Sequence, residues 1–341
     1  MKIFLLELFK GKIFRYAMAL SMALVLFLGG FYLGKNRIEK DDQLGNQPQD
    51  VEIRQGGYKF ISPLLECEIG AFPLLKNSEI KIKKAVESEI INNNPDDFIA
   101  LYFRDLNNGP SFGINEQESF SPASLLKVPL MMAYYKYAET DPKILEQTIP
   151  YANPSPQFQQ KFSPEERIEI GKRYTIEELI EAMIKYSDNE ATNLLFQNIS
   201  QDKLRVVFDD LGIAMPDVYD PNNAMPVKDY ASFFRMLYNA SYLDRDMSER
   251  ALELLSVVEY KDGLIAGVPS NITISHKFGE RELTDEKGNV VNQLHDCGIV
   301  YYPEHPYLLC IMTRGKNIDN LSRSISAISK IVYQEVSLRA K

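Results

Sequence analysis

Residues 120–139 read FSPASLLKVPLMMAYYKYAE. Ser-Pro-Ala-Ser before an apolar run predicts that Ser124 lies at or near a helix N-terminus, where unpaired backbone N–H groups favour developing negative charge. Lys127 follows one turn later on the same helix face. A serine hydroxyl is a weak nucleophile until a base takes its proton, and a lysine whose pKa is lowered by burial can be that base. Alone, the pattern is also typical of a cap serine followed by a surface lysine.

A second polar pattern, Ser187-Asp188-Asn189, stands between two predicted helices. A short loop there could project Ser187 and Asn189 into a cleft. The alternative is an Asx-type cap for the helix that starts at Glu190.

A third pattern is His276-Lys277-Phe278-Gly279, at the end of a predicted strand. This position can place the Lys277 cation at a sheet edge, and Gly279 would let a ligand approach the backbone closely. The alternative is an ordinary strand end with an exposed lysine.

The order of predicted elements indicates an α+β fold. Thr175-x-x-Glu178 forms a capping box ahead of an amphipathic segment. Helices are predicted for 77–93, 176–186, 193–199, 203–211, 229–237, 248–258 and 321–336, and strands for 98–103, 111–114, 272–277, 297–302 and 307–313. In this layout both ends of the domain cover one antiparallel sheet, and the middle is helical.

Together these patterns resemble the class A β-lactamase and penicillin-binding protein superfamily. The three polar motifs follow the order and rough spacing of serine acyl-transfer enzymes that act on penicillins and D-Ala-D-Ala peptides. The resemblance includes FSPASLLKVPLMMAYYKYAE, YSDNEATNLLFQNI, NNAMPVKDYASFFRMLY and GVPSNITISHKFGE, and covers residues 98–336. It implies a β-lactamase/DD-peptidase-like α+β fold, with a five-stranded antiparallel sheet flanked by N- and C-terminal helices and a helical subdomain.

The resemblance implies catalytic roles for Ser124, Lys127, Ser187 and Lys277, the last of which would attract the substrate carboxylate. Ser124 would be the acylated nucleophile and Lys127 its proton acceptor or relay. Ser187 would pass the proton to the leaving nitrogen. The backbone N–H groups of Ser124 and Glu280 would form the oxyanion hole.

Substrate-binding roles are expected for Asn189, Gly279 and Glu280. Asn189 would hydrogen-bond the side-chain amide of the substrate, Gly279 would allow it a close approach to the backbone, and Glu280 would contribute its backbone N–H. The expected substrate is a β-lactam or a D-Ala-D-Ala peptide. No cofactor is expected, and the scattered cysteines and histidines predict no metal site.

Two departures from the family pattern affect the expected reaction. Phe278 stands where the family usually has a hydroxyl residue, so one polar contact to the substrate carboxylate is missing. The stretch 211–227 contains no glutamate to activate a deacylating water, and its only carboxylates are Asp217 and Asp220. Loss of a general base typically costs about 10²–10⁴-fold in rate.

The sequence therefore favours a membrane-anchored serine hydrolase of class A β-lactamase type, which would be acylated at Ser124 and release product slowly. One alternative is a peptidoglycan D,D-peptidase, either a D-Ala-D-Ala carboxypeptidase or an endopeptidase, and His276 beside Lys277 also occurs in such relatives. Another is a β-lactam sensor that is acylated without turnover.

The N-terminus predicts an uncleaved membrane anchor. The apolar run 16–34 is long enough to span a bilayer, follows Lys10, Lys12 and Arg15, and lacks a good cleavage site, although a signal peptide is the alternative. We expect a short cytoplasmic segment (1–15), a transmembrane anchor (16–34), a polar linker (35–57) and an extracytoplasmic hydrolase domain (58–341).

The amino-acid composition, and its net charge in particular, argues against one class of binding partner. The 341 residues include 38 Lys+Arg and 47 Asp+Glu, a formal charge of −9, which disfavours nucleic acid. A monomer is expected.

Cys297 and Cys310 lie on two arms of a predicted hairpin, and because direct cross-strand disulfides strain the preferred geometry, both are expected to be small buried hydrophobic residues. Cys67 allows no interpretation.

Overall fold

The computed structural model describes residue 22 and residues 51–68, 77–93, 97–107, 109–154, 162, 166–216, 224–284 and 288–339. The chain divides into two compact units, Met1–Gln49 and Asp50–Lys341. Apart from Met22, the predicted anchor (16–34) lies outside the described residues. Within those described ranges, no helix combines the length and the apolar character that a bilayer crossing needs.

A small two-stranded sheet opens the second unit. β1 (Val51–Arg54) pairs antiparallel with β2 (Leu64–Glu68). These four residues of β1 form a strand where the sequence predicts polar linker. Their alternation of apolar and charged residues fits a strand, but so short a run becomes a strand only through its partner.

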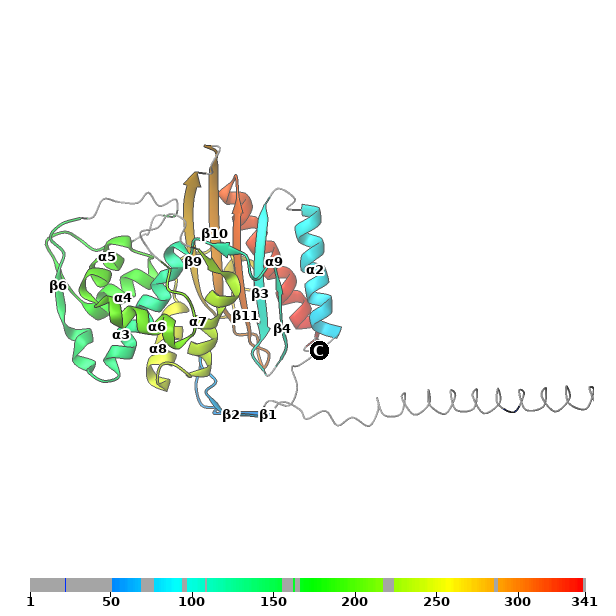
Figure 1. The fold of residues 1–341 in the computed structure, drawn as a ribbon, viewed down its shortest axis with the longest axis horizontal. Helices are drawn as coiled ribbons and strands as arrows, with labels where there is room; N and C mark the ends of the chain where they lie inside the picture. Colours follow the sequence, from blue (N-terminus) through cyan, green and yellow to red (C-terminus); the bar gives the residue numbers. More distant parts are fainter. Residues whose placement is uncertain are drawn as a thin grey trace, which may run out of the picture. The chain divides into compact units, whose positions relative to one another are not determined.

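The central sheet has five antiparallel strands in the order β4-β3-β11-β10-β9 (Figure 1). Their bounds are Phe98–Asp105 (β3), Ser111–Ile114 (β4), Ile274–Thr284 (β9), Val290–Val300 (β10) and Tyr307–Gly315 (β11). The predicted five-stranded sheet is confirmed. β9 and β10 extend further toward their connecting turn than predicted, because cross-strand pairing stabilises a charged stretch that lacks an apolar strand pattern.

Two helices cover one face of the sheet, as the predicted layout requires (Figure 1). They are α2 (Asn77–Asn93) and α9 (Ile318–Arg339). One face of α9 carries the buried residues Leu321, Ile325, Ile328, Val332 and Val336 at helical spacing. These pack into a cluster with apolar residues of β3, β10 and β11, so the α2 and α9 face of the sheet is covered mainly by apolar side chains.

The other face of the sheet meets the helical half. Its helices are α3 (Lys127–Ala138), α4 (Ile176–Lys185), α5 (Asn189–Asn198), α6 (Gln201–Asp210), α7 (Val227–Asn239) and α8 (Arg245–Leu255). Short 3₁₀ helices are η1 (Ala123–Leu126), η2 (Pro142–Glu146) and η3 (Ile265–Gly267). Two small sheets pair β5 (Ser119–Phe120) with β8 (Met225–Pro226), and β6 (Thr148–Pro150) with β7 (Arg173–Thr175).

Capping residues set where several of these helices begin. The predicted capping box of Thr175 and Glu178 is confirmed at the start of α4. α5, α6 and α8 begin two to four residues earlier than predicted, because Asp188, Ser200 and Asp244 accept hydrogen bonds from the first free backbone N–H groups. The starts of α5, α6 and α8 are therefore set by polar caps rather than by the first apolar residue.

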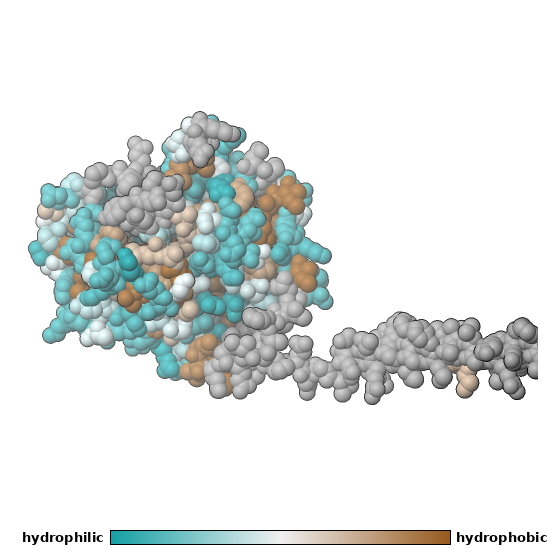
Figure 2. Space-filling view, viewed as in Figure 1, coloured by the Kyte–Doolittle hydropathy of each residue, from teal (hydrophilic) through white to brown (hydrophobic). Residues whose placement is uncertain are grey.

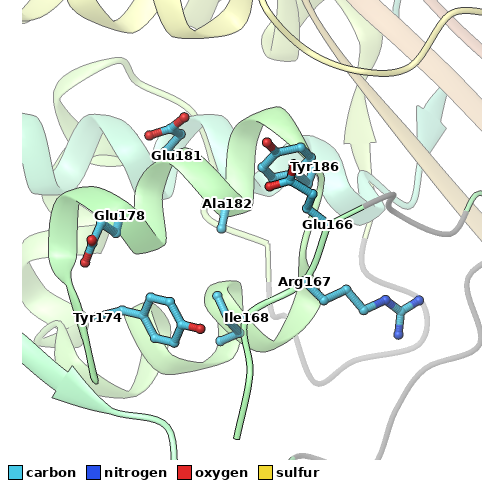
Figure 3. A pocket seen from close by; sticks show the side chains of 8 residues that line it. All are labelled: Glu166, Arg167, Ile168, Tyr174, Glu178, Glu181, Ala182 and Tyr186. Carbon is cyan, nitrogen blue, oxygen red and sulfur yellow. The ribbon is translucent and has the colours of Figure 1, made fainter. Parts of the chain in front are cut away.

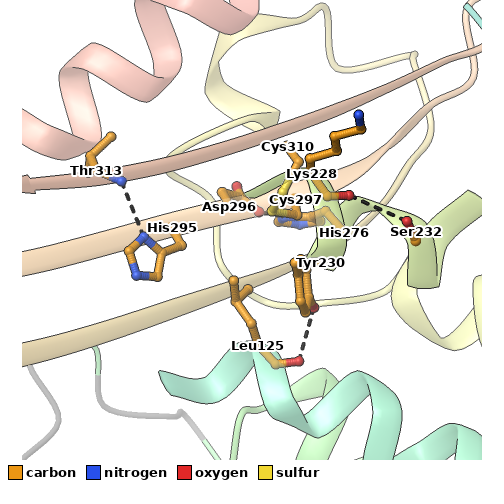
Figure 4. The surroundings of a disulfide bond; sticks show 10 residues. All are labelled: Leu125, Lys228, Tyr230, Ser232, His276, His295, Asp296, Cys297, Cys310 and Thr313. Atoms are coloured by element: carbon orange, nitrogen blue, oxygen red, sulfur yellow. Dashed lines mark hydrogen bonds and ion pairs between the residues drawn. A yellow bond between two sulfur atoms is a disulfide. The ribbon is translucent and has the colours of Figure 1, made fainter. Parts of the chain in front are cut away.

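A disulfide joins the neighbouring strands β10 and β11 of the sheet. Cys297 on β10 lies directly opposite Cys310 on β11, and the two are bonded, with Cα atoms 3.9 Å apart (Figure 4). The prediction of two unlinked buried cysteines is therefore wrong. The predicted hairpin placed both cysteines on neighbouring arms, but the direct register between them emerges only from the assembled sheet.

The surface view agrees with a water-facing domain. Figure 2 shows hydrophilic residues over most of the visible face, with small, separate hydrophobic areas. The exposed large hydrophobic side chains include Ile91 on α2, 71% exposed, and Leu338 on α9, 65% exposed. Scattered exposure of this kind is normal for a globular surface.

Candidate active site

Ser124 lies in the 3₁₀ turn η1, which leads directly into α3 at Lys127. The residue before it, Ala123, has a φ of 49°. This is the left-handed backbone region, which residues other than glycine rarely adopt. Ser187 shares this rare conformation, with a φ of 56°. Backbone strain of this kind persists where the surrounding structure enforces it, and it is common at functional sites.

Lys127 is buried, 3% exposed, at the start of α3. Its Nζ donates to Ser187 O at 2.6 Å, Ser187 Oγ at 3.0 Å and Asn189 Oδ1 at 2.8 Å. Within the part of the chain that the structure describes, Ser124 Oγ is not one of these acceptors. Burial, and then the charge of Lys277, lower the pKa of Lys127 well below its usual range, which favours the neutral amine that can accept a proton.

Lys277 lies on β9 and is fully buried. Its Nζ donates to Ser187 Oγ at 3.0 Å and to Phe278 O at 3.1 Å. Burial lowers the pKa of Lys277 to about 7, although the charges of Asp296 and Glu280 oppose the shift. The Ser187 hydroxyl thus contacts the side-chain nitrogens of both lysines, and the first, second and third sequence patterns meet around it.

Gly279 lies close to the turn that carries Ser124. A Cβ atom at Gly279 would lie 3.0 Å from Pro122 O and 3.1 Å from Leu125 N. The glycine therefore lets β9 pack directly against η1, and its predicted role of admitting a ligand stays a prediction. The next residue, Glu280, follows on the same strand, and its carboxylate accepts a hydrogen bond from Phe162 N at 3.0 Å.

A group of hydrogen bonds that the sequence analysis missed holds the segment before Ser124. Ser121 N donates to Gln293 Oε1 at 3.1 Å, and Arg281 Nη1 donates to Ser121 Oγ at 2.6 Å. Ser121 O accepts from the ring of His295 at 2.9 Å. Every polar group of Ser121 thus has a partner on β9 or β10. The register that pairs Gln293 with Arg281 has no local sequence signal.

The tautomer of His295 follows from its neighbours. Thr313 N donates to His295 Nδ1 at 3.2 Å (Figure 4), so Nδ1 is the acceptor and Nε2 carries the proton given to Ser121 O. Burial lowers the pKa of His295 to about 4. Tyr230 on α7 donates to Leu125 O at 3.0 Å. The turn that carries Ser124 is therefore held from both the sheet and the helical half.

His276 points to the opposite face of the sheet from Lys277 and forms a buried pair with Asp296, with Nδ1 and Oδ1 2.9 Å apart. Leu264 N donates to the other carboxylate oxygen at 2.9 Å. This pair lies beneath Lys277.

Asp217 and Asp220, the candidate bases of the stretch 211–227, lie outside the described residues.

A separate pocket lies on the helical half (Figure 3). It is lined by Glu166, Arg167, Ile168, Tyr174, Glu178, Glu181, Ala182 and Tyr186. None of the predicted site residues lines it, although Ile168 N donates to Asp188 Oδ2 at 3.0 Å. In the ranges that the structure covers, no group of histidine, cysteine, aspartate and glutamate residues could hold a metal ion.

The five-stranded sheet, its two covering helices and the helical half define a class A β-lactamase-like fold. Residues 81–336 match the model of the beta-lactamase enzyme family, and the chain belongs to this family.

Solved structures support the fold. PBP-A is 22% identical with a TM-score of 0.62, covering 78% of this chain and 99% of that one. A class A β-lactamase from Bacteroides cellulosilyticus is 17% identical with a TM-score of 0.64, covering 76% and 99%.

Sequence similarity to curated proteins is more local. The β-lactamase ROB-1 of Haemophilus influenzae is 36% identical over 101 residues, which is 30% of this chain. The match spans about a third of that relative's length, 32%. ROB-1 of Mannheimia haemolytica matches equally.

Proposed function

We propose that this protein is a serine hydrolase that is acylated at Ser124 by β-lactams and then hydrolyses the acyl-enzyme slowly. The observation that carries the proposal is the position of Ser187 Oγ, 3.0 Å from the Nζ atoms of both Lys127 and Lys277. This is the arrangement a proton relay from a lysine base to a leaving group requires.

Acylation begins when neutral Lys127 takes the proton of Ser124 Oγ as that oxygen attacks the β-lactam carbonyl carbon. The negative charge that develops on the carbonyl oxygen is stabilised by the backbone N–H groups of Ser124 and Glu280. The ring C–N bond then breaks, and the proton passes from Lys127 through Ser187 to the leaving nitrogen. Lys277 attracts the substrate carboxylate, and Asn189 binds the side-chain amide.

Deacylation is the slow step in this proposal. It requires a base to activate water, and the stretch 211–227 contains no glutamate. Asp217 and Asp220 are the nearest candidates in sequence. The absence of this glutamate also favours the second candidate function, a peptidoglycan D,D-peptidase. A β-lactam sensor would be the extreme case, in which the acyl group is never released from Ser124. A solved structure of a PBP-A mutant, 23% identical to this chain, is an acyl-enzyme complex with penicillin G.

We further propose that residues 16–34 anchor the chain in a membrane as a single span, with the catalytic domain on the extracytoplasmic side. The length of the apolar run and the preceding lysines and arginine support this orientation. Protease treatment of intact cells tests it. Loss of the domain while a cytoplasmic marker survives is expected, and full protection would contradict the orientation.

The test of the reaction is an intact-mass time course of the protein with excess benzylpenicillin. We expect a covalent adduct that accumulates and decays slowly. An adduct that forms transiently while the penicillin is consumed would show efficient turnover and direct attention to Asp217 and Asp220. Ser124→Ala should abolish the adduct, and labelling that survives in this variant would show that Ser124 is not the nucleophile.

A further inference from the structure

Ser121 lies three residues before Ser124 and takes no part in the proposed reaction, yet side chains of two strands hold it. Its N–H donates to Gln293 Oε1 at 3.1 Å, and its hydroxyl accepts from Arg281 Nη1 at 2.6 Å. Its carbonyl oxygen accepts from the ring of His295 at 2.9 Å. Because Ser121 is only 4% exposed, these bonds are made largely out of water, where they are strong.

The side chains that hold Ser121 project from the same face of β9 and β10 as Lys277. Lys277, Gly279 and Arg281 alternate along β9, so they share a face of the strand. On β10, a residue directly opposite Arg281 and another directly opposite Gly279 supply the remaining two bonds. Residues that lie directly opposite each other in an antiparallel pair project to the same side. One pair of strands therefore holds both Lys277 and the segment that leads to the nucleophile.

Ala123 is the strained link between Ser121 and Ser124. Its φ of 49° lies in the left-handed region, which is unfavourable for a residue with a Cβ atom. The chain is held on both sides of this residue, by the sheet at Ser121 and by the Tyr230 hydroxyl, which donates to Leu125 O at 3.0 Å. Strain of this kind persists only where the surrounding contacts enforce it. If the contacts at Ser121 were lost, Ala123 would relax and displace the Ser124 side chain.

We propose that Gln293, Arg281 and His295 are positioning residues for the nucleophile: acting through Ser121, they hold the turn in the conformation that presents Ser124 Oγ for attack. This inference rests on the proposed function, since it takes Ser124 as the group that is acylated. It assigns to these three side chains an effect on the rate of acylation, although none of them takes or gives a proton in the proposed reaction.

The test compares two buried amide side chains that are neighbours on β10. Gln293 is 6% exposed and bonds to Ser121, whereas Asn292 is 4% exposed and donates to Lys316 O at 2.9 Å. Gln293→Met and Asn292→Leu each remove one amide and keep the side-chain volume nearly unchanged. Both substitutions should lower the melting temperature. Only Gln293→Met should slow acylation.

Stopped-flow acylation by benzylpenicillin separates the limiting rate constant from the half-saturating concentration. In Gln293→Met the limiting rate constant should fall by about 10- to 100-fold while the half-saturating concentration changes by less than about twofold, because a misplaced nucleophile slows the chemical step without weakening binding. A loss of folded protein alone would reduce the amount of adduct and leave this rate constant unchanged. Asn292→Leu should leave both quantities as they are in the wild-type protein.

A second pair of variants applies if Gln293→Met does not fold. Arg281 is half-buried, so Arg281→Met removes the bond to Ser121 Oγ at a position that tolerates change. The limiting rate constant should fall in this variant as well, by a smaller factor. Arg281→Lys keeps a donor and should restore most of the rate.

Ala123→Gly tests whether the contacts act through the backbone of the turn. Glycine adopts the left-handed region freely, so Ala123→Gly should recover about fivefold of the rate lost in Gln293→Met and change the wild-type rate by less than about twofold. Equal effects of Ala123→Gly in the two proteins, or a normal limiting rate in the folded Gln293→Met or Arg281→Met protein, would overturn this inference alone. A wild-type protein that forms no adduct would overturn the proposed function and this inference together.

Discussion

The two faces of the central sheet differ in what their residues contribute. The face beneath α2 and α9 is packed with aliphatic side chains, and the Asp296–His276 pair is hydrogen-bonded there. The face toward the helical half buries the amino groups of Lys127 and Lys277, and two residues near them, Ala123 and Ser187, adopt the left-handed conformation. Burying ionisable groups costs free energy. On the first face Asp296 is paired with His276 among apolar side chains, whereas the two lysines of the second face lie together, so we expect the first face to contribute more to stability and the second to be arranged for chemistry.

The largest effect is expected from Lys127→Met, which tests whether the second face serves chemistry rather than stability. The substitution keeps the side-chain volume and removes the amino group. We expect the acylation rate with benzylpenicillin to fall by about 10²–10⁴-fold, because the base is lost. The melting temperature should change much less than the rate, because the cost of burying the amino group is removed while Ser187 O and Asn189 Oδ1 lose a hydrogen-bond donor. Stopped-flow acylation and calorimetry measure the two effects. Lys136→Ala, a half-exposed position on the same helix, is the control, and a Lys127→Met enzyme that acylates normally would exclude Lys127 as the base.

For a residue on the face beneath α2 and α9 we expect the reverse, a loss of stability with no change in the acylation rate. Ile328→Ala on α9 should lower the free energy of unfolding by about 2–5 kcal/mol through the cavity it leaves, while the folded variant keeps its acylation rate. Ile91→Ala, at an exposed site on α2, should change stability by less than about 0.5 kcal/mol. Chemical denaturation measures both. Equal losses in the two variants would show that this face does not supply the stability.

A change of pH should have a smaller effect on the acylation rate and on stability. The acylation rate should fall as the pH rises through about 7, because Lys277 loses the proton that attracts the substrate carboxylate. Its folded-state pKa is lowered, so between about 7 and the ordinary value of 10.5 the unfolded chain binds the extra proton and stability rises with pH. Activity and stability should therefore move in opposite directions over this range. A pH–rate profile beside pH-dependent melting tests this, and parallel profiles would contradict it.

Short motifs in the sequence predict which side chains come together at this candidate site, while their roles in a reaction stay predictions. Ser187, Asn189 and Lys277 could be predicted because their spacing is characteristic, and the structure brings them to Lys127. The contacts that hold Ser121 could not, since they depend on the register of β9 and β10. The same applies to the disulfide, which requires Cys297 and Cys310 to lie directly opposite each other. The close approach of Gly279 to the turn that carries Ser124 likewise follows from the packing of β9 and has no local sequence signal.

The chain order of the site has a consequence for synthesis. The contact between Lys127 and Ser187 joins residues 60 apart, and that between Ser187 and Lys277 joins residues 90 apart. The turn η1, which carries Ser124, also packs against β9, which the ribosome synthesises much later. A growing chain therefore contains Ser124 well before it contains the strand that completes the proposed site, and we expect no reactivity at Ser124 before β9 is in place.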